Sequence, residues 1–198
     1  VNQLWSICTQ VLAGLKYFES QGIYHGNLNF RSIYLTKENK VKLAKVFVPI
    51  HILQEHFSKF LIFEDCIFYS PEFLQKQVYS SQSDIYAFGV LLFSCFSGKW
   101  PLKYSHNINE IKKELIKPFV PFKKRSETIP DRLGVIIEIC LRKNSQHRFN
   151  SFSELILAYK GEDTRALRDK SYDAGLVENE IETSLESFSK KKRQGVIK

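Results

Sequence analysis

The sequence predicts a mainly α-helical domain with one small β-hairpin near its start. Three observations support this fold class: several stretches carry apolar residues at helical spacing, one later stretch is apolar nearly all round, and two short apolar runs flank a polar turn. Hydrophobic residues make up 43% of the 198, which is enough for one packed core and excludes wholesale disorder.

The first predicted helix covers residues 2–20, and Gly22 supplies a stop signal just beyond it. Two apolar runs, Ile33–Leu35 and Val41–Leu43, follow as the strands of a hairpin, because the five residues between them are polar. Residues 47–68 show no clear period, and we expect a long loop there.

A second predicted helix lies at the centre of the domain. Residues 85–96 are apolar nearly all round apart from Ser94, which is typical of a buried helix. We expect Ser83 and Asp84 to cap its start, and residues 97–101, which contain glycine and proline, to end it.

Three peripheral helices are predicted at 109–116, 133–141 and 152–158, from apolar residues at helical spacing. These elements complete a domain over residues 1–158. Apolar density falls beyond residue 160, so we interpret 159–198 as a polar tail, within which four spaced apolar side chains indicate a short helix.

The net charge of +8 indicates the kind of partner to expect. Residues 161–198 carry eight charges of each sign, so the whole excess belongs to the residues before them. A basic body attracts nucleic acid, anionic lipid or an acidic protein. Because no nucleic-acid-binding signature accompanies the charge, nucleic acid is disfavoured, and we expect a protein partner, with an acidic one matching the charge.

Cysteine usage and hydropathy suggest the compartment. The four cysteines are widely spaced with no CxxC pair, no apolar run is long enough to span a bilayer, and no secretory leader opens the chain. We therefore expect a cytoplasmic protein without a metal site. The basic run from Lys190 to Arg193 leaves import into the nucleus as an alternative.

Five landmarks follow one another along the chain, in the stretches 24–35, 41–47, 69–72, 83–92 and 140–149. In that order they resemble the catalytic loop H-R-D-L-x-x-x-N, the strand that leads into D-F-G, the A-P-E segment, the start of the large buried helix and the C-L-x-x-D-P-x-x-R-P segment of protein kinases. The resemblance implies the C-terminal lobe of a kinase. No glycine-rich loop or V-A-I-K strand is present, so the N-terminal lobe is absent from the chain.

The resemblance also implies that the positions that carry the chemistry are substituted. The substituted positions are Asn27 for the catalytic Asp, Asn29 for the loop Lys, Ser32 for the magnesium-binding Asn and Lys45 for the Asp of D-F-G, while His25 is architectural. An amide is not a base near neutral pH, and an ammonium group repels Mg²⁺. Lys45 is either a solvated or ion-paired lysine or fills the vacated metal site as a point charge.

By contrast, the positions that support the fold match the family. In kinases, the equivalents of Glu72 and Arg148 form an ion pair, and the equivalent of Asp84 holds backbone amides of the catalytic loop. The resemblance therefore implies a pseudokinase that acts as a protein-binding or allosteric module, closest to the tyrosine-kinase-like branch. The alternative is a divergent ATP-dependent kinase that acts with an upstream N-terminal lobe, and only this alternative calls for ATP and Mg²⁺.

Basic residues also gather around the predicted helix 109–116. Lys112, Lys113 and Lys117 are candidates for binding an acidic partner. A solvated charged face is the other interpretation of the same residues.

Overall fold

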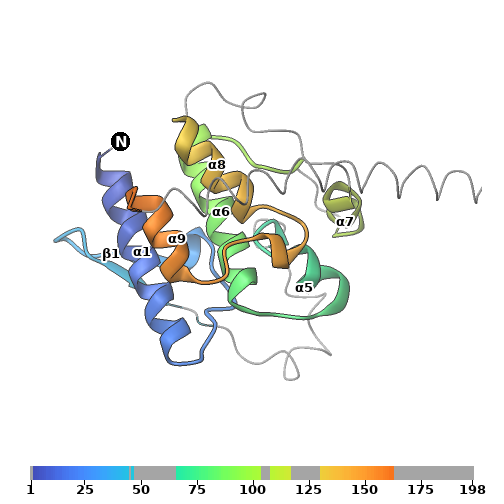
Figure 1. Ribbon diagram of the computed structural model, residues 1–198, viewed down its shortest axis with the longest axis horizontal. Coiled ribbons are helices and arrows are strands. Elements are labelled where there is room, and N and C mark those ends of the chain that lie inside the picture. The colour runs from blue at the N-terminus through green and yellow to red at the C-terminus, as the bar shows by residue number, and fades with distance from the viewer. Residues whose placement is uncertain (1, 45, 47–65, 104–107, 117–129, 163–198) are drawn as a thin grey trace, which may run out of the picture.

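A computed structural model of the chain describes residues 2–44, 46, 66–103, 108–116 and 130–162 (Figure 1). The described part is mainly helical, with one two-stranded antiparallel sheet. Its helices are α1 (Asn2–Ser20), α5 (Pro71–Lys76), α6 (Ser81–Ser97), α7 (Ile108–Ile116), α8 (Asp131–Cys140) and α9 (Phe152–Lys160). Within the same described ranges, single 3₁₀ turns lie at η1 (Phe30–Ser32) and η3 (Ser145–His147).

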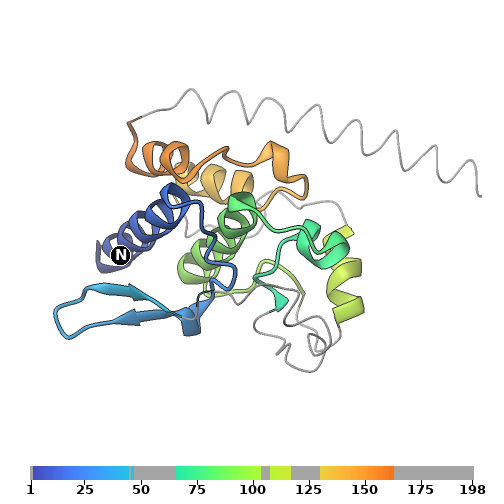
Figure 2. The same cartoon turned by 90° about the horizontal axis from the view of Figure 1, so that it is seen from below.

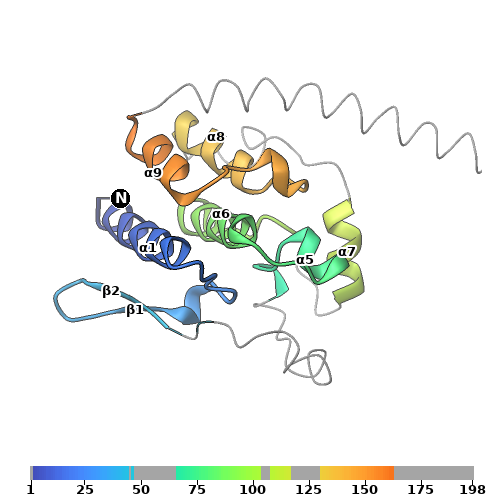
Figure 3. The ribbon, with the colours of Figure 1, turned by 60° about the horizontal axis from the view of Figure 1, so that its bottom comes forward.

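Helix α6 is the centre of the core. Residues 83–93 are buried without interruption, as the all-round apolar pattern predicted. Helices α1 and α8 pack directly against α6, and α9 packs against both α1 and α8 (Figure 2). The hairpin lies beside α1, and α5 and α7 lie together at the other end of the molecule (Figure 3).

The start of α6 differs from the prediction. The cap predicted at Ser83 and Asp84 is wrong, because the helix begins at Ser81 and extended Ser80 precedes it. Ser83 instead takes the third helical position, where its Oγ accepts a hydrogen bond from the Ser80 N–H at 3.3 Å. Several serines in succession offer equal capping propensity, so the local sequence could not choose among them.

The end of α6 agrees with the prediction. Gly98 follows the helix with φ +66°, a left-handed conformation that glycine adopts without strain, and its N–H donates to the Ser94 carbonyl at 3.0 Å.

The hairpin pairs β1 (Ile33–Leu35) with β2 (Val41–Leu43), as predicted. Tyr34 lies opposite Lys42 in the register. Gln10 of α1 fastens the hairpin by both ends of its amide: its Nε2 donates to the Asn39 carbonyl at 3.1 Å, and its Oε1 accepts from the Val41 N–H at 3.0 Å.

The remaining helices match the predicted ones apart from their ends. The last helix continues two residues beyond the predicted end at 158, to Lys160, and its start is capped by Ser151, whose Oγ accepts from the Glu154 N–H. Helix α5 was not predicted, because six residues are too few to show a helical period. The predicted tail helix, Lys190 to Arg193 and most of the predicted long loop lie outside the described residues.

Among the described helices, none has the length and apolarity needed to cross a membrane.

Candidate functional site

The buried carboxylate of Asp84 holds the start of the segment that resembles a catalytic loop. Asp84 Oδ2 accepts a hydrogen bond from the His25 N–H at 2.7 Å, and Oδ1 accepts from the Gly26 N–H at 3.0 Å. Tyr79 Oη donates to the same Oδ1 at 2.7 Å. Gly26 has φ +73°, which a glycine adopts without strain. Helix α6 thus anchors this loop through one side chain.

Burial shifts the pKa values of both Asp84 and Tyr79. It raises the pKa of Asp84 to about 6, against the three hydrogen bonds that favour the carboxylate. Burial, followed by the charge of Asp84, raises the pKa of Tyr79 well above its ordinary value. Tyr79 therefore stays protonated, and its hydroxyl donates a hydrogen bond to Asp84.

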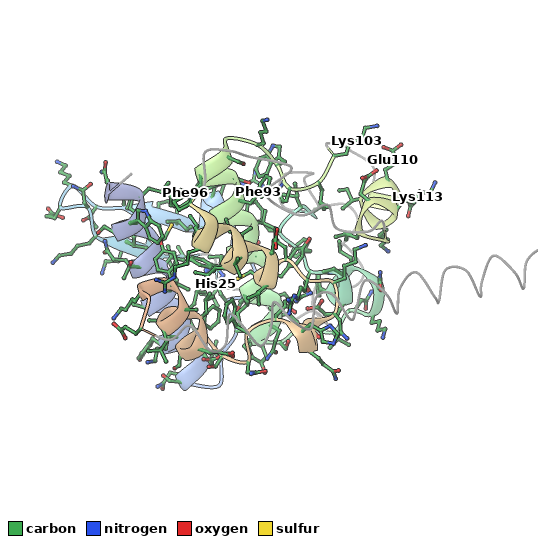
Figure 4. The ribbon with its side chains drawn as sticks, turned by 45° about the horizontal axis from the view of Figure 1, so that its top comes forward. His25, Phe93, Phe96, Lys103, Glu110 and Lys113 are labelled. Atoms are coloured by element: carbon green, nitrogen blue, oxygen red, sulfur yellow. The ribbon has the colours of Figure 1, made fainter. Side chains whose placement is uncertain are left out.

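His25 lies in the interior of the molecule (Figure 4). Burial lowers the pKa of His25 to about 4, so its ring is neutral at physiological pH. Its Nδ1 accepts a hydrogen bond from the Asn27 N–H at 3.3 Å, and the ring packs edge-to-face with Phe18, with 5.9 Å between centroids. These contacts hold the His25 ring inside the fold. The ring has no solvent-exposed surface through which it could exchange a proton with a bound molecule.

Asn27, Asn29 and Ser32 form a local hydrogen-bond network around η1. The Asn29 amide nitrogen donates to the Asn27 side-chain oxygen at 3.0 Å, and its own side-chain oxygen accepts from the Arg31 N–H at 2.8 Å. Ser32 Oγ accepts from the Asn29 N–H at 2.9 Å and donates to the Asn29 carbonyl at 2.8 Å. Asn29 and Ser32 therefore cap the turn reciprocally.

This network bears on the magnesium and nucleotide that the kinase resemblance implies. The oxygens of Asn27, Asn29 and Ser32 are engaged within the loop and carry no negative charge. Mg²⁺ sites in proteins depend on one or two carboxylates, and none of these three side chains supplies one, so the described residues at these positions do not fit the ion. Lys45 lies outside the described residues. In the described ranges, no group of three or more His, Cys, Asp or Glu residues is arranged to hold a metal.

Glu72 and Arg148 form a second buried centre, between α5 and the segment after η3. Arg148 Nη1 and Nη2 each donate to one oxygen of the Glu72 carboxylate at 2.8 Å, a bidentate pair. Arg148 also donates to three carbonyls, those of Gln82, Arg142 and Lys143. These contacts engage all five N–H donors of the guanidinium.

Neighbouring side chains support this pair. Ser83 Oγ donates to Glu72 Oε1 at 2.8 Å, and the Tyr86 ring lies 5.0 Å from the centre of the Arg148 guanidinium. Burial acts to raise the pKa of Glu72, but the hydrogen bonds and charge of Arg148 outweigh it and hold the pKa below its ordinary value. Glu72 is therefore ionised across the neutral range.

The structure brings the predicted residues into two groups that meet at the start of α6. Asp84 belongs to the loop group, and its neighbour Ser83 belongs to the Glu72–Arg148 group. Tyr79 and Tyr86 are partners of these groups that were not predicted from the sequence. No spacing rule relates a loop tyrosine to a carboxylate five residues later, so only the fold reveals the contact.

The basic residues predicted to bind a partner are only partly described. Lys113 is exposed on α7, and Figure 4 shows it on the same side of the molecule as Lys103 and Glu110. Lys112 is half-buried on the same helix, and Lys117 lies outside the described residues.

Comparison with known proteins matches residues 1–158 to the family described as protein tyrosine and serine/threonine kinase. The chain is 27% identical over 110 residues to the serine/threonine-protein kinase pakE of Dictyostelium discoideum, covering 56% of this chain and 12% of the relative. It is 29% identical over 143 residues to the serine/threonine-protein kinase Nek6 of Oryza sativa subsp. japonica, covering 71% and 25%. It is also 29% identical over 112 residues to the human tyrosine-protein kinase TXK, covering 56% and 21%.

The chain thus spans a quarter or less of the length of these relatives. The family match, by contrast, extends over most of the chain, from the first helix to α9. The matched residues include Asp84, which holds the loop, and the ion pair of Glu72 with Arg148. This chain belongs to the protein tyrosine and serine/threonine kinase family.

Proposed function

We propose that this chain is the C-terminal lobe of a catalytically impaired kinase domain, a pseudokinase of the tyrosine-kinase-like branch that serves as a protein-binding or allosteric module. One observation carries the proposal. The position of the family's catalytic base holds Asn27, an uncharged amide whose oxygen accepts a hydrogen bond from Asn29. Loss of a positioned general base typically costs about 10²- to 10⁴-fold in rate.

The neighbouring substitutions support the same proposal. Asn29 and Ser32 cap η1 and each other, so their polar atoms serve the loop's own backbone. In the sequence, Lys45 stands where the family has its magnesium-binding carboxylate. Each of these changes removes a separate role in phosphoryl transfer, and phosphoryl transfer depends mainly on positioning and charge neutralisation.

The alternative function is a divergent ATP-dependent kinase that requires an upstream N-terminal lobe. The observation that favours this alternative is that the residues supporting the fold keep the contacts that the kinase family has. Asp84 still holds the loop, and Glu72 still pairs with Arg148, as an active domain would need.

Transfer of labelled γ-phosphate from ATP with Mg²⁺ tests the two functions. The protein as it occurs in the cell is compared with its Asn27→Ala variant, with myelin basic protein and a Glu/Tyr copolymer as acceptors. We expect both proteins to give the same background signal. Transfer that Asn27→Ala abolishes would establish the kinase and refute the pseudokinase.

We further propose a protein partner with an acidic surface. The excess positive charge and exposed Lys113 support this class of partner, and Lys112 lies one position before it on α7.

A further inference from the structure

Helices α1 and α6 each carry a cysteine at the contact where they meet. The two helices pack directly on one another. Trp5 of α1 packs edge-to-face on Phe96 of α6, with 5.5 Å between ring centroids (Figure 4). Cys8 lies three residues after Trp5, and Cys95 directly precedes Phe96. Because residues three apart share one face of a helix, Cys8 faces α6 as Trp5 does.

Helix α9 closes the same contact with Tyr159. The Tyr159 ring lies 4.6 Å from that of Trp5. Burial, followed by the neighbouring thiol of Cys8, raises the pKa of Tyr159, and Cys95 adds to the rise. Burial, followed by Cys95, raises the pKa of Cys8 to about 12. Since Coulomb interactions weaken with distance, the two thiols and the Tyr159 hydroxyl form one cluster.

The four cysteines of the chain differ in their access to solvent. All are free thiols. Cys95 is half-buried near the end of α6, whereas Cys8, Cys66 and Cys140 are 5%, 3% and 0% exposed. A small oxidant therefore reaches Cys95 first, and Cys8 is the thiol of the cluster that lies behind it.

A metal does not account for this pair of thiols. Structural zinc is held by four ligands, most often cysteine and histidine. In the part of the chain that the structure describes, no group of three or more His, Cys, Asp or Glu residues is arranged to hold a metal. Two thiols without a third ligand are suited to bond with each other.

We propose that Cys8 and Cys95 are a redox-sensitive pair, which hydrogen peroxide joins in a disulfide that ties α1 to α6. The Cys95 sulfur takes one peroxide oxygen as a sulfenic acid, and the other oxygen leaves as water. The Cys8 sulfur then attacks the sulfenic sulfur, forms the S–S bond and releases a second water. The two thiols lose two electrons and two protons, and one peroxide takes up both.

The environment of the thiols sets the rate of this reaction. Burial raises the pKa of Cys95, and burial together with Cys95 raises that of Cys8, so both stay protonated at neutral pH. Because the thiolate is the nucleophile, oxidation is slow there, and we expect it to be about tenfold faster at pH 8 than at pH 7. The pair thus responds to prolonged oxidation.

The disulfide would close a loop around the candidate site. Residues 9–94 lie between the two cysteines and include the loop that resembles a catalytic loop, the hairpin and α5. Asp84 already holds that loop to the start of α6, and the new bond would link α1 to the other end of α6. A cross-link over a loop of this length restricts the unfolded chain and so stabilises the fold.

Peptide mapping of the whole protein tests the proposal. The protein is treated with hydrogen peroxide, alkylated and digested with trypsin without a reductant. Trypsin leaves Cys8, Cys66, Cys95 and Cys140 on four separate peptides, which end at Lys16, Lys76, Lys99 and Arg142. We expect the peptides ending at Lys16 and Lys99 to be joined, and dithiothreitol to separate them. Links to Cys66 or Cys140 in equal amount, or overoxidised Cys95 without any link, would overturn the inference.

Thermal unfolding supplies the second measurement. We expect peroxide to raise the melting temperature by about 5 °C or more, and Cys8→Ala to abolish that rise. Cys66→Ala is the matched control, since it also replaces a buried cysteine, and the rise should persist in it. If Cys8→Ala does not fold, Cys95→Ala replaces it, because this side chain is only half-buried. A rise that persists without either thiol would contradict the disulfide.

Discussion

The backbone N–H of His25 donates a 2.7 Å hydrogen bond to the carboxylate of Asp84, and burial shifts the pKa values of these two residues in opposite directions. It raises the pKa of Asp84 from 3.8 to about 6 and lowers the pKa of His25 from 6.5 to about 4. Between about pH 4 and 6 the folded protein therefore holds an extra proton on Asp84 and lacks one on His25, relative to the unfolded chain.

These two shifts lead to opposite pH dependences. Asp84 binds more protons when folded, so its contribution to the free energy of unfolding falls as pH rises from about 4 to 6. His25 binds fewer protons when folded, so its contribution rises between about pH 4 and 6.5. The two contributions offset each other in the wild-type protein.

Single substitutions should separate the two contributions. Relative to wild type, Asp84→Asn should make the slope of unfolding free energy against pH more positive between pH 4 and 6, by about 1 kcal/mol per pH unit. His25→Gln should make it more negative by a similar amount. Urea unfolding at a series of pH values measures both slopes, and slopes parallel to wild type in both variants would contradict the pKa shifts.

The Glu72–Arg148 pair should be costly to break. Arg148→Ala leaves a buried carboxylate without its partner, and we expect the free energy of unfolding to fall by about 3 kcal/mol or more. Arg148→Lys should recover little, because an ammonium group cannot reproduce the bidentate contact.

An exposed ion pair provides the control for this prediction. Lys160 and Glu162 lie 4.0 Å apart with side chains 49% and 57% exposed, so Lys160→Ala should change stability by less than about 0.5 kcal/mol. Equal losses for Arg148→Ala and Lys160→Ala in urea unfolding would show that the buried pair is not special.

Gly89 should not tolerate a methyl group. A Cβ at this position would lie 2.6 Å from the Cys140 Cβ, where α6 and α8 pack, so Gly89→Ala should destabilise the protein by about 1–3 kcal/mol. Cys140→Ala should not rescue it, since alanine keeps the Cβ. The melting temperature and urea midpoint of both variants test this.

Gly14 offers the matched comparison. A Cβ there would lie 2.8 Å from the end of the Leu43 side chain, which can move, and alanine gains about 1 kcal/mol of helix propensity over glycine. We expect Gly14→Ala to be close to neutral. A loss as large as that of Gly89→Ala would mean that the hairpin side of α1 is as tightly packed as the α6–α8 contact.

Asn29 should stabilise the folded loop better than lysine, the residue that the kinase family has at this position. Asn29→Lys removes the acceptor for the Arg31 N–H and the donor to Asn27, so it should destabilise the protein by about 1 kcal/mol. Asn29→Asp keeps the acceptor and should cost less. Greater stability of Asn29→Lys than of wild type in thermal unfolding would refute a capping role.

The local elements of this protein follow from its sequence because their causes are local. The apolar run of α6 predicts a central helix, polar residues between two apolar runs predict the hairpin, and Gly98 ends α6 where the sequence places a stop. These features depend on spacing and on the conformational preferences of single residues, which a sequence displays directly.

The tertiary structure alone decided which polar groups meet. Ser83 was predicted to cap α6, yet it donates to Glu72, and Tyr79 was not singled out, yet it donates to Asp84. Burial then sets the protonation of Asp84 and His25 in opposite directions. Removal from water depends on every element that packs around a side chain, so no stretch of sequence near Asp84 or His25 could predict it.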